Sequence, residues 1–162
     1  ALQRACDAII TADEVLIFGL GNSASIAMDA AHKFFRLGVK AHAYTDNHMQ
    51  AIAAAHTNEK SVVMGISHSG ASKDVVRALQ LAKENSAVTI AVTHMGKSPI
   101  EKVSDIVLAT VSDETNYRIL GLNSRITQLT IIDAMYSYLV CHFPHAPENV
   151  AITEDSLHDK KI

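Results

Sequence analysis

Five short apolar runs constrain the fold of this chain more than any other feature of its sequence. They cover residues 15–18, 39–44, 61–66, 88–92 and 106–108. Most of them lack polar alternation, which is typical of strands buried on both faces of a parallel sheet. The segments between them repeat apolar residues at helical spacing. The sequence therefore predicts an α/β fold, a three-layer α/β/α sandwich around a five-stranded parallel sheet with the flavodoxin-like strand order 2-1-3-4-5.

Local signals mark where the expected helices begin and end. Gly38 follows an apolar helical pattern and is a typical C-terminal stop. Ser98, Pro99 and Glu101 have the spacing of a capping box with proline at the first helical position. A long helix is expected over residues 123–142, and prolines follow it. We therefore expect one domain over residues 1–143, followed by a polar tail over 144–162 that is loosely attached or forms a short helix.

The composition excludes several classes of protein. Hydrophobic residues make up 48% of the 162 residues and charged residues 19%, which argues against disorder. The formal net charge of −3 provides no global basic field for nucleic acid or an anionic membrane. Cys6 and Cys141 have no CxxC spacing, so neither a disulfide framework nor a zinc site is expected, and a cytoplasmic location fits. No apolar run is long enough to span a bilayer.

The loop after the third run carries the clearest signal for a ligand. Ser67, His68, Ser69, Gly70 and Ser72 lie between a predicted strand and a predicted helix. The start of a helix offers unpaired N–H groups and a partial positive charge, glycine permits close approach, and serine hydroxyls donate to phosphate oxygens. These residues predict a phosphate-binding loop. In the alternative interpretation, Ser72 is an ordinary N-cap and the other serines only fill the loop.

Polar residues also follow the other strands, where ligands bind in open parallel sheets. Together with the loop at 67–72, they predict a phosphorylated sugar lying across the strand ends. The candidate sugar-binding residues are Gly21, Asn22, Ser23, His48, Thr93, Ser98, Glu114 and Ser124.

Two features of the sequence bear on other kinds of site. Gly19, Gly21 and Ala24 fit the dinucleotide-binding pattern, and Asp46 follows at a suitable distance. A nicotinamide cofactor nevertheless leaves the second anion loop unexplained, and the chain is too short to add a substrate domain. The nine histidines show no ligand spacing with a third partner, so no metal and no cofactor is expected.

The strand-end motifs resemble those of the sugar isomerase (SIS) fold. The resemblance covers nearly all of residues 2–142. It rests on Gly-x-Gly-x-Ser after the first strand, Ser-x-Ser-Gly-x-Ser after the third, and a threonine followed by Ser98-Pro99 after the fourth. In that family, the residues matching Ser67, Ser69 and Ser72 hold the sugar phosphate. The middle position is often glutamine and is His68 here, which leaves its side-chain contact open.

Four stretches resemble the effector-binding domain of RpiR-type transcriptional regulators: residues 33–38, 46–50, 69–74 and 124–133. The resemblance implies a phosphosugar sensor in carbohydrate metabolism that forms a homodimer through its helices, or a higher homo-oligomer. Its ligand would be of the hexose or amino-sugar 6-phosphate class. It also implies an N-terminal helix-turn-helix domain, absent from this chain, through which DNA would be bound.

An isomerase is the alternative on the same fold. Aldose–ketose isomerisation needs a base that moves a proton between adjacent carbons. Glu114 is the candidate base and His48 or His94 would assist, although the favoured interpretation of Glu114 is a solvated loop carboxylate. In the last helix, Met135, Tyr138 and Leu139 face either a partner subunit or the sheet.

Overall fold

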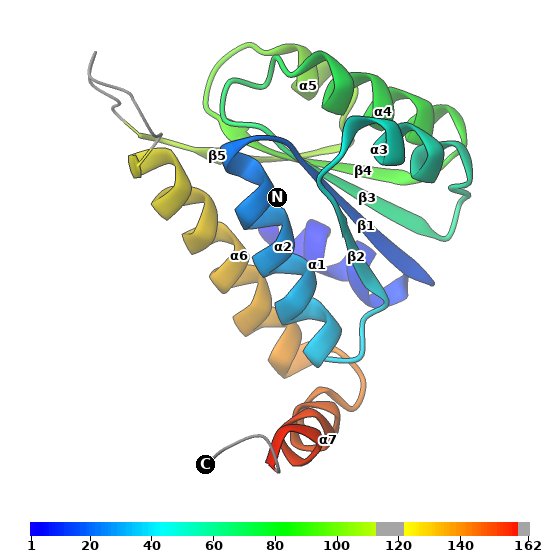
Figure 1. Ribbon diagram of the computed structural model, residues 1–162, viewed down its shortest axis with the longest axis vertical. Helices are drawn as coiled ribbons and strands as arrows, with labels where there is room; N and C mark the ends of the chain where they lie inside the picture. The colour runs from blue at the N-terminus through cyan, green and yellow to red at the C-terminus, as the bar shows by residue number, and fades with distance from the viewer. Residues whose placement is uncertain (113–121, 159–162) are drawn as a thin grey trace.

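A parallel sheet forms the centre of the molecule, seen in a computed structural model that describes residues 1–112 and 122–158. In this part of the chain the sheet has five strands in the order β2-β1-β3-β4-β5, as predicted, and all neighbouring pairs are parallel (Figure 1). The strands are β1 (Glu14–Gly19), β2 (Ala41–Tyr44), β3 (Ser61–Ile66), β4 (Val88–His94) and β5 (Ile106–Thr110). Every residue of the central strand β3 is buried, which explains why its sequence carries no polar alternation.

Helices cover both faces of the sheet. α1 (Leu2–Thr11), α2 (Asn22–Arg36) and α6 (Leu122–His142) enclose one apolar core with the sheet. α3 (Asn47–Ala55), α4 (Lys73–Glu84) and the short α5 (Pro99–Lys102) enclose a second core on the opposite face (Figure 1). The predicted three-layer sandwich is therefore confirmed. Among the described residues, no helix has the length and apolar character needed to cross a membrane.

The long helix α6 faces the sheet with the residues whose orientation the sequence left open. Met135 and Leu139 are fully buried in the core beneath the sheet. Tyr138 is partly buried, stacks on His142 with ring centroids 4.0 Å apart, and donates a hydrogen bond to Asp7. These residues therefore hold α6 to the fold, and they do not form a free surface for a partner.

The segment expected as a polar tail contains α7 (Ala146–His158), which packs against α2. Ala146 is fully buried, and the Asn149 amide donates to the Leu37 carbonyl oxygen at 2.8 Å. Arg36 forms an ion pair with Glu154. The segment is thus tied to the domain by contacts far apart in the sequence.

α5 begins at Pro99, as its sequence predicts, but the expected capping box is not formed. The Ser98 side chain makes no capping hydrogen bond to the helix backbone, and its hydroxyl donates to the Glu101 carboxylate at 3.1 Å. The serine hydroxyl is paired with the Glu101 side chain and not with a backbone N–H group of the helix. The predicted start of α5 is therefore confirmed, and the predicted capping box is wrong.

Asp105 and Cys6 are among the ionisable groups whose pKa is shifted by their surroundings. Partial burial alone would raise the pKa of Asp105. The Lys83 ammonium, 2.7 Å away, and hydrogen bonds from the Thr89 N–H and hydroxyl lower this pKa below its ordinary value. Burial under α6, with a smaller effect of Asp7, raises the pKa of the Cys6 thiol to about 12.

Candidate functional site

The loop between β3 and α4 has a defined backbone conformation. The Ser67 N–H donates to the Val92 carbonyl oxygen at 3.0 Å, and the Gly70 N–H donates to the Ser67 carbonyl oxygen at 3.1 Å. The Ser69 hydroxyl oxygen accepts from the Ala71 N–H at 3.3 Å. Gly70 has a φ of 61°, in the left-handed region that favours glycine. Hydrogen bonds within the loop and to β4 therefore hold its conformation without a ligand.

The β4 strand end fixes this loop from one side. The His68 carbonyl oxygen accepts from the His94 N–H at 3.1 Å and from the Thr93 hydroxyl at 3.3 Å. The Gly70 carbonyl oxygen accepts from the N–H of Ile100 in α5 at 3.0 Å. A Cβ on Gly70 would lie 2.5 Å from the Ser98 hydroxyl oxygen, so only glycine fits. Thr93 is fully buried and supports the loop from below.

The start of α4 offers donors to an anion. Ser72 occupies the N-cap position, but its side chain makes no capping hydrogen bond. The first intrahelical bond runs from the Val76 N–H to the Ser72 carbonyl oxygen, so the N–H groups of Lys73, Asp74 and Val75 have no acceptor within the helix. The interpretation of Ser72 as an ordinary side-chain cap is not supported, and the geometry suits a phosphate.

A hollow of about 260 Å³ lies beside the loop, on the β4 side. The rings of His68 and His94 stand at its wall with centroids 5.3 Å apart, tilted by 58°. Within the described residues, the His94 Nδ1 and the Ser112 hydroxyl oxygen are buried without a hydrogen-bond partner. The lining residues are His68, Ser69, His94, Met95, Gly96, Lys97, Ser98 and Ser112.

The β1 loop lies on the other side of the phosphate loop, where the strand order reverses between β1 and β3. Gly21 has a φ of 56° and precedes the first residue of α2. Asn22 is exposed and Ser23 is partly buried, both in the first turn of α2. The fully buried Gln50 amide donates to the Tyr44 carbonyl oxygen at 2.8 Å and to that of Gly19 at 3.4 Å, which fixes the ends of β1 and β2.

The dinucleotide alternative does not fit this geometry. The Asp46 carboxylate accepts from the Met49 N–H at 2.9 Å and caps α3, so its position after β2 has a local explanation. Dinucleotide-binding sheets place β1 between β2 and β4, whereas here β1 lies between β2 and β3. The glycines that suggested a cofactor instead allow a tight turn, since a Cβ on Gly19 would collide with the Ser23 carbonyl.

Other predicted residues lie on elements outside the β3–α4 loop. His48 is exposed at the start of α3, after the edge strand β2, which lies two strands away from β3. Ser124 is almost fully buried near the start of α6. Glu114 lies outside the described residues. In the described ranges, no three histidine, cysteine or acidic residues are placed to hold a metal ion.

Sequence reasoning did not single out Lys97 or Gln128, and it counted Ser112 only among the hydroxyls that follow the strands. Lys97 and Ser112 line the hollow with the two histidines, although they follow different strands. Gln128 in α6 is 1% exposed, and its Nε2 has no hydrogen-bond partner in the described part of the chain. Lys97 lies three residues after His94, the last residue of β4. Its position after a strand was the signal that could have pointed to it.

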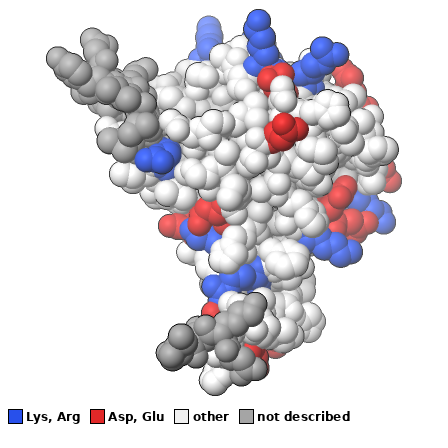
Figure 2. All heavy atoms as spheres, in the orientation of Figure 1, with Lys and Arg blue, Asp and Glu red and all other residues white. Residues whose placement is uncertain are grey.

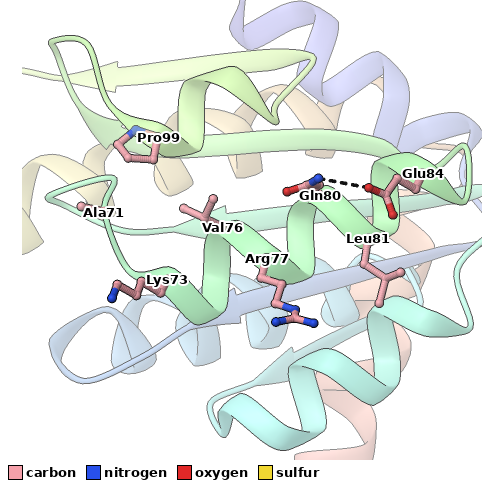
Figure 3. A pocket seen from close by; sticks show the side chains of 8 residues that line it. All are labelled: Ala71, Lys73, Val76, Arg77, Gln80, Leu81, Glu84 and Pro99. Carbon is pink, nitrogen blue, oxygen red and sulfur yellow. Dashed lines mark hydrogen bonds between the residues drawn. The ribbon is translucent and has the colours of Figure 1, made fainter.

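A larger hollow of about 690 Å³ runs along α4 from Ala71, in the loop that follows β3, to Glu84 at the end of the helix (Figure 3). Its wall mixes charged and apolar side chains, and the Gln80 amide donates to Glu84 at 3.1 Å along the helix. The sequence predicted no site there. Size alone does not decide function, because both hollows border the loop at 67–72, this one at Ala71 and the smaller one at Ser69. The lining residues are Ala71, Lys73, Val76, Arg77, Gln80, Leu81, Glu84 and Pro99.

Comparison with known families agrees with this geometry. The family model for the SIS domain matches residues 8–138, which include the whole sheet and the loop at 67–72. The chain belongs to the SIS domain family. The part of α6 beyond residue 138 and all of α7 lie outside the match to this SIS domain.

A transcriptional regulator is similar to this SIS domain in sequence, and solved structures with more varied descriptions share its fold. The transcriptional regulator RpiR of Escherichia coli is 37% identical over 135 residues, covering 83% of this chain and 46% of RpiR. The chain thus spans about half the length of this relative.

Two solved structures share the fold. The NanR protein of Vibrio vulnificus, complexed with ManNAc-6P, has a TM-score of 0.93 at 22% identity and covers 99% of this chain and 61% of that chain. A Methanococcus jannaschii protein with an inferred 3-hexulose-6-phosphate isomerase function has a TM-score of 0.74 at 21% identity. The match covers 93% of this chain and 81% of the Methanococcus jannaschii protein. At these identities the likeness shows the fold alone.

Proposed function

We propose that this SIS domain is the ligand-sensing part of an RpiR-type transcriptional regulator and binds a hexose or amino-sugar 6-phosphate. The observation that carries the proposal is the loop at 67–72, where Gly70 and the first N–H groups of α4 provide a preformed place for a phosphate dianion. The similarity to the regulator RpiR supports a sensing role, and the phosphosugar bound to the structural neighbour NanR supports the ligand class.

In this proposal, DNA is bound by a separate domain. Figure 2 shows positive and negative side chains interspersed on the visible face, with large uncharged areas between them. The net charge is −3. Since DNA affinity rests on neutralising phosphates with clustered lysine and arginine, this domain is better suited to a small ligand. Such a regulator would act in the cytoplasm on genes of carbohydrate metabolism.

We also expect a homodimer formed through helices. Met28 and Phe35 lie two turns apart on α2 and are 57% and 60% exposed, and Ile126 on the neighbouring α6 is 64% exposed. Exposed apolar side chains on adjacent helices favour burial against another protein surface. Sedimentation velocity of the wild type and of a Phe35→Glu variant tests this expectation, because a dimer formed through this face should dissociate in the variant.

The binding experiment is calorimetry with glucose 6-phosphate, glucosamine 6-phosphate and N-acetylmannosamine 6-phosphate. Ser69→Ala and Ser72→Ala should each weaken binding about tenfold or more, since a hydrogen bond to a charged group contributes roughly 1.5–3 kcal/mol. Ser137→Ala is the matched control, because its hydroxyl bonds only within α6, at the Asp133 carbonyl. Unchanged affinity in both loop variants would mean that the serines are structural, and binding of NAD without any phosphosugar would contradict the proposal.

Isomerase activity is the second candidate, favoured by the two imidazoles of His68 and His94 beside the phosphate loop. Imidazoles and carboxylates are the groups that move protons in such reactions. NMR spectra of each sugar phosphate incubated with the domain test for turnover. Sustained aldose–ketose conversion that is lost in Glu114→Gln would replace the sensing role with catalysis.

A further inference from the structure

The hollow beside the phosphate loop is lined by hydrogen-bond donors. His68, His94 and Lys97 carry nitrogen donors. Hydroxyl groups are carried by Ser69, Ser98 and Ser112. Within the part of the chain that the structure describes, its wall contains no aspartate or glutamate. The Glu101 carboxylate is held on the α5 side, where it accepts from the Ser98 hydroxyl at 3.1 Å. A wall of this composition suits an anion better than a neutral sugar hydroxyl.

Two polar atoms at this wall need a partner. The His94 Nδ1 and the Ser112 hydroxyl oxygen are buried without a hydrogen-bond partner among the described residues. An unsatisfied buried polar atom costs about 1–3 kcal/mol, so such atoms in a native protein call for a specific explanation. Both atoms belong to residues that line the same hollow, from β4 and from the end of β5. A bound group with acceptor oxygens would satisfy donors from two strands at once.

The hollow is distinct from the place expected for the phosphate, yet adjoins it. Ser69 belongs to the phosphate loop and also lines the hollow. Gly96 leaves room on the loop that follows β4, since a Cβ built there would have no atom within 4 Å. Lys97, next in sequence, is exposed and brings a full positive charge. One ligand held at Ser69 therefore reaches both places.

We propose that this hollow binds a second anionic group, so that the ligand is a phosphorylated sugar carrying a further carboxylate or phosphate. The inference rests on the proposed function, because it assumes that the first phosphate occupies the loop at 67–72. His68 and His94 donate hydrogen bonds to the second group, and Lys97 contributes its charge.

Two matched pairs of compounds test this inference by calorimetry. Glucitol 6-phosphate and 6-phosphogluconate differ only at C1, where the second carries a carboxylate. Fructose 6-phosphate and fructose 1,6-bisphosphate differ by one phosphate. We expect the more anionic member of at least one pair to bind about tenfold more tightly, the factor that corresponds to roughly 1.4 kcal/mol. The pair that responds distinguishes a carboxylate from a second phosphate.

Variants of the wall locate the effect. Lys97→Gln and His94→Gln should reduce the preference for the more anionic member, each by about threefold to fivefold, in keeping with the modest strength of exposed charge pairs. Lys102→Gln and His42→Gln are the matched controls, because both residues are exposed and lie outside the hollow. These controls should keep the full preference.

The two proposals fail in different ways. Equal affinities within both pairs, with glucitol 6-phosphate still dependent on Ser69, would overturn the second anion site and leave phosphosugar binding standing. A preference that survives unchanged in Lys97→Gln and His94→Gln would place the second group elsewhere and overturn the inference. Failure of every phosphorylated sugar to bind would overturn the proposed function and this inference with it.

Discussion

The crowding around Gly70 makes a quantitative prediction for Gly70→Ala. A residue other than glycine in the left-handed region costs roughly 1–2 kcal/mol. The new Cβ would also lie 2.5 Å from the Ser98 hydroxyl oxygen and 2.8 Å from that of Thr93, and forcing an atom into such a packed place costs about 1–3 kcal/mol. The free energy of unfolding should therefore fall by about 2–5 kcal/mol in total.

The Gly21→Ala variant separates the cost of backbone strain from the cost of steric crowding. Gly21 also has a positive φ, but a Cβ there would meet no atom within 4 Å, so only backbone strain of about 1–3 kcal/mol is expected. Replacing Ser98 with Gly removes the nearest obstructing atoms. A double-mutant cycle by urea denaturation should give a favourable coupling of about 1 kcal/mol or more between Gly70→Ala and Ser98→Gly, and none between Gly21→Ala and Ser98→Gly.

A coupling within about 0.5 kcal/mol of zero in both cycles would refute the crowding argument, because that is the ordinary error of additivity. Thermal denaturation provides a second measure. For a domain of this size, each kcal/mol corresponds to about 2–4 °C, so Gly70→Ala should lower the melting temperature by at least about 4 °C. The same variant should bind phosphosugars less tightly, since the loop has to move to admit the methyl group.

Four further predictions concern stability and reactivity. Asn149→Ala should cost about 1 kcal/mol of unfolding free energy by urea denaturation, because it removes the hydrogen bond that ties α7 to the end of α2; an unchanged midpoint would mean that α7 contributes nothing to stability. Native protein should react with a thiol reagent at the exposed Cys141 alone, and the fully buried Cys6 should react only after unfolding. Stability should also fall as the pH rises above 9.0 towards about 12, because the unfolded Cys6 thiol ionises there while the folded one keeps its proton, and Cys6→Ala should lack this loss. Asp105→Asn should be less stable than the wild type at neutral pH, and the difference should narrow as the pH falls below 3.8, because the lowered pKa of Asp105 stabilises the fold only while the carboxyl is ionised in both states; a difference that is constant with pH would exclude the ion pair with Lys83 as its cause.

The architecture was predictable because strand burial leaves a direct trace in the sequence. A strand covered on both faces is mostly apolar, and β3 and the middle of β4 carry that pattern without polar alternation. Once the strands are known, parallel order places all their carboxyl ends at one edge. The position of the phosphate loop between a strand and a helix followed from the same pattern.

The details of the site were less accessible, because they depend on contacts between loops that are distant in sequence. Thr93 and Ser98 look alike as hydroxyls after a strand, but Thr93 is fully buried and bonds to the His68 carbonyl, whereas Ser98 lines the hollow. Lys97 and Ser112 meet there only because β4 and β5 are neighbours. The attachment of α7 likewise rests on Asn149 and Leu37, which are 112 positions apart.

The reversal of strand order between β1 and β3 has a mechanical consequence. The β1 loop begins α2, which belongs to one helical layer, and the β3 loop begins α4, which belongs to the opposite layer. A ligand that contacts both loops joins two helices that the sheet otherwise keeps apart. Its binding energy is then shared between the layers, so hydrogen exchange should slow together at the first turns of α2 and α4, on opposite faces of the protein.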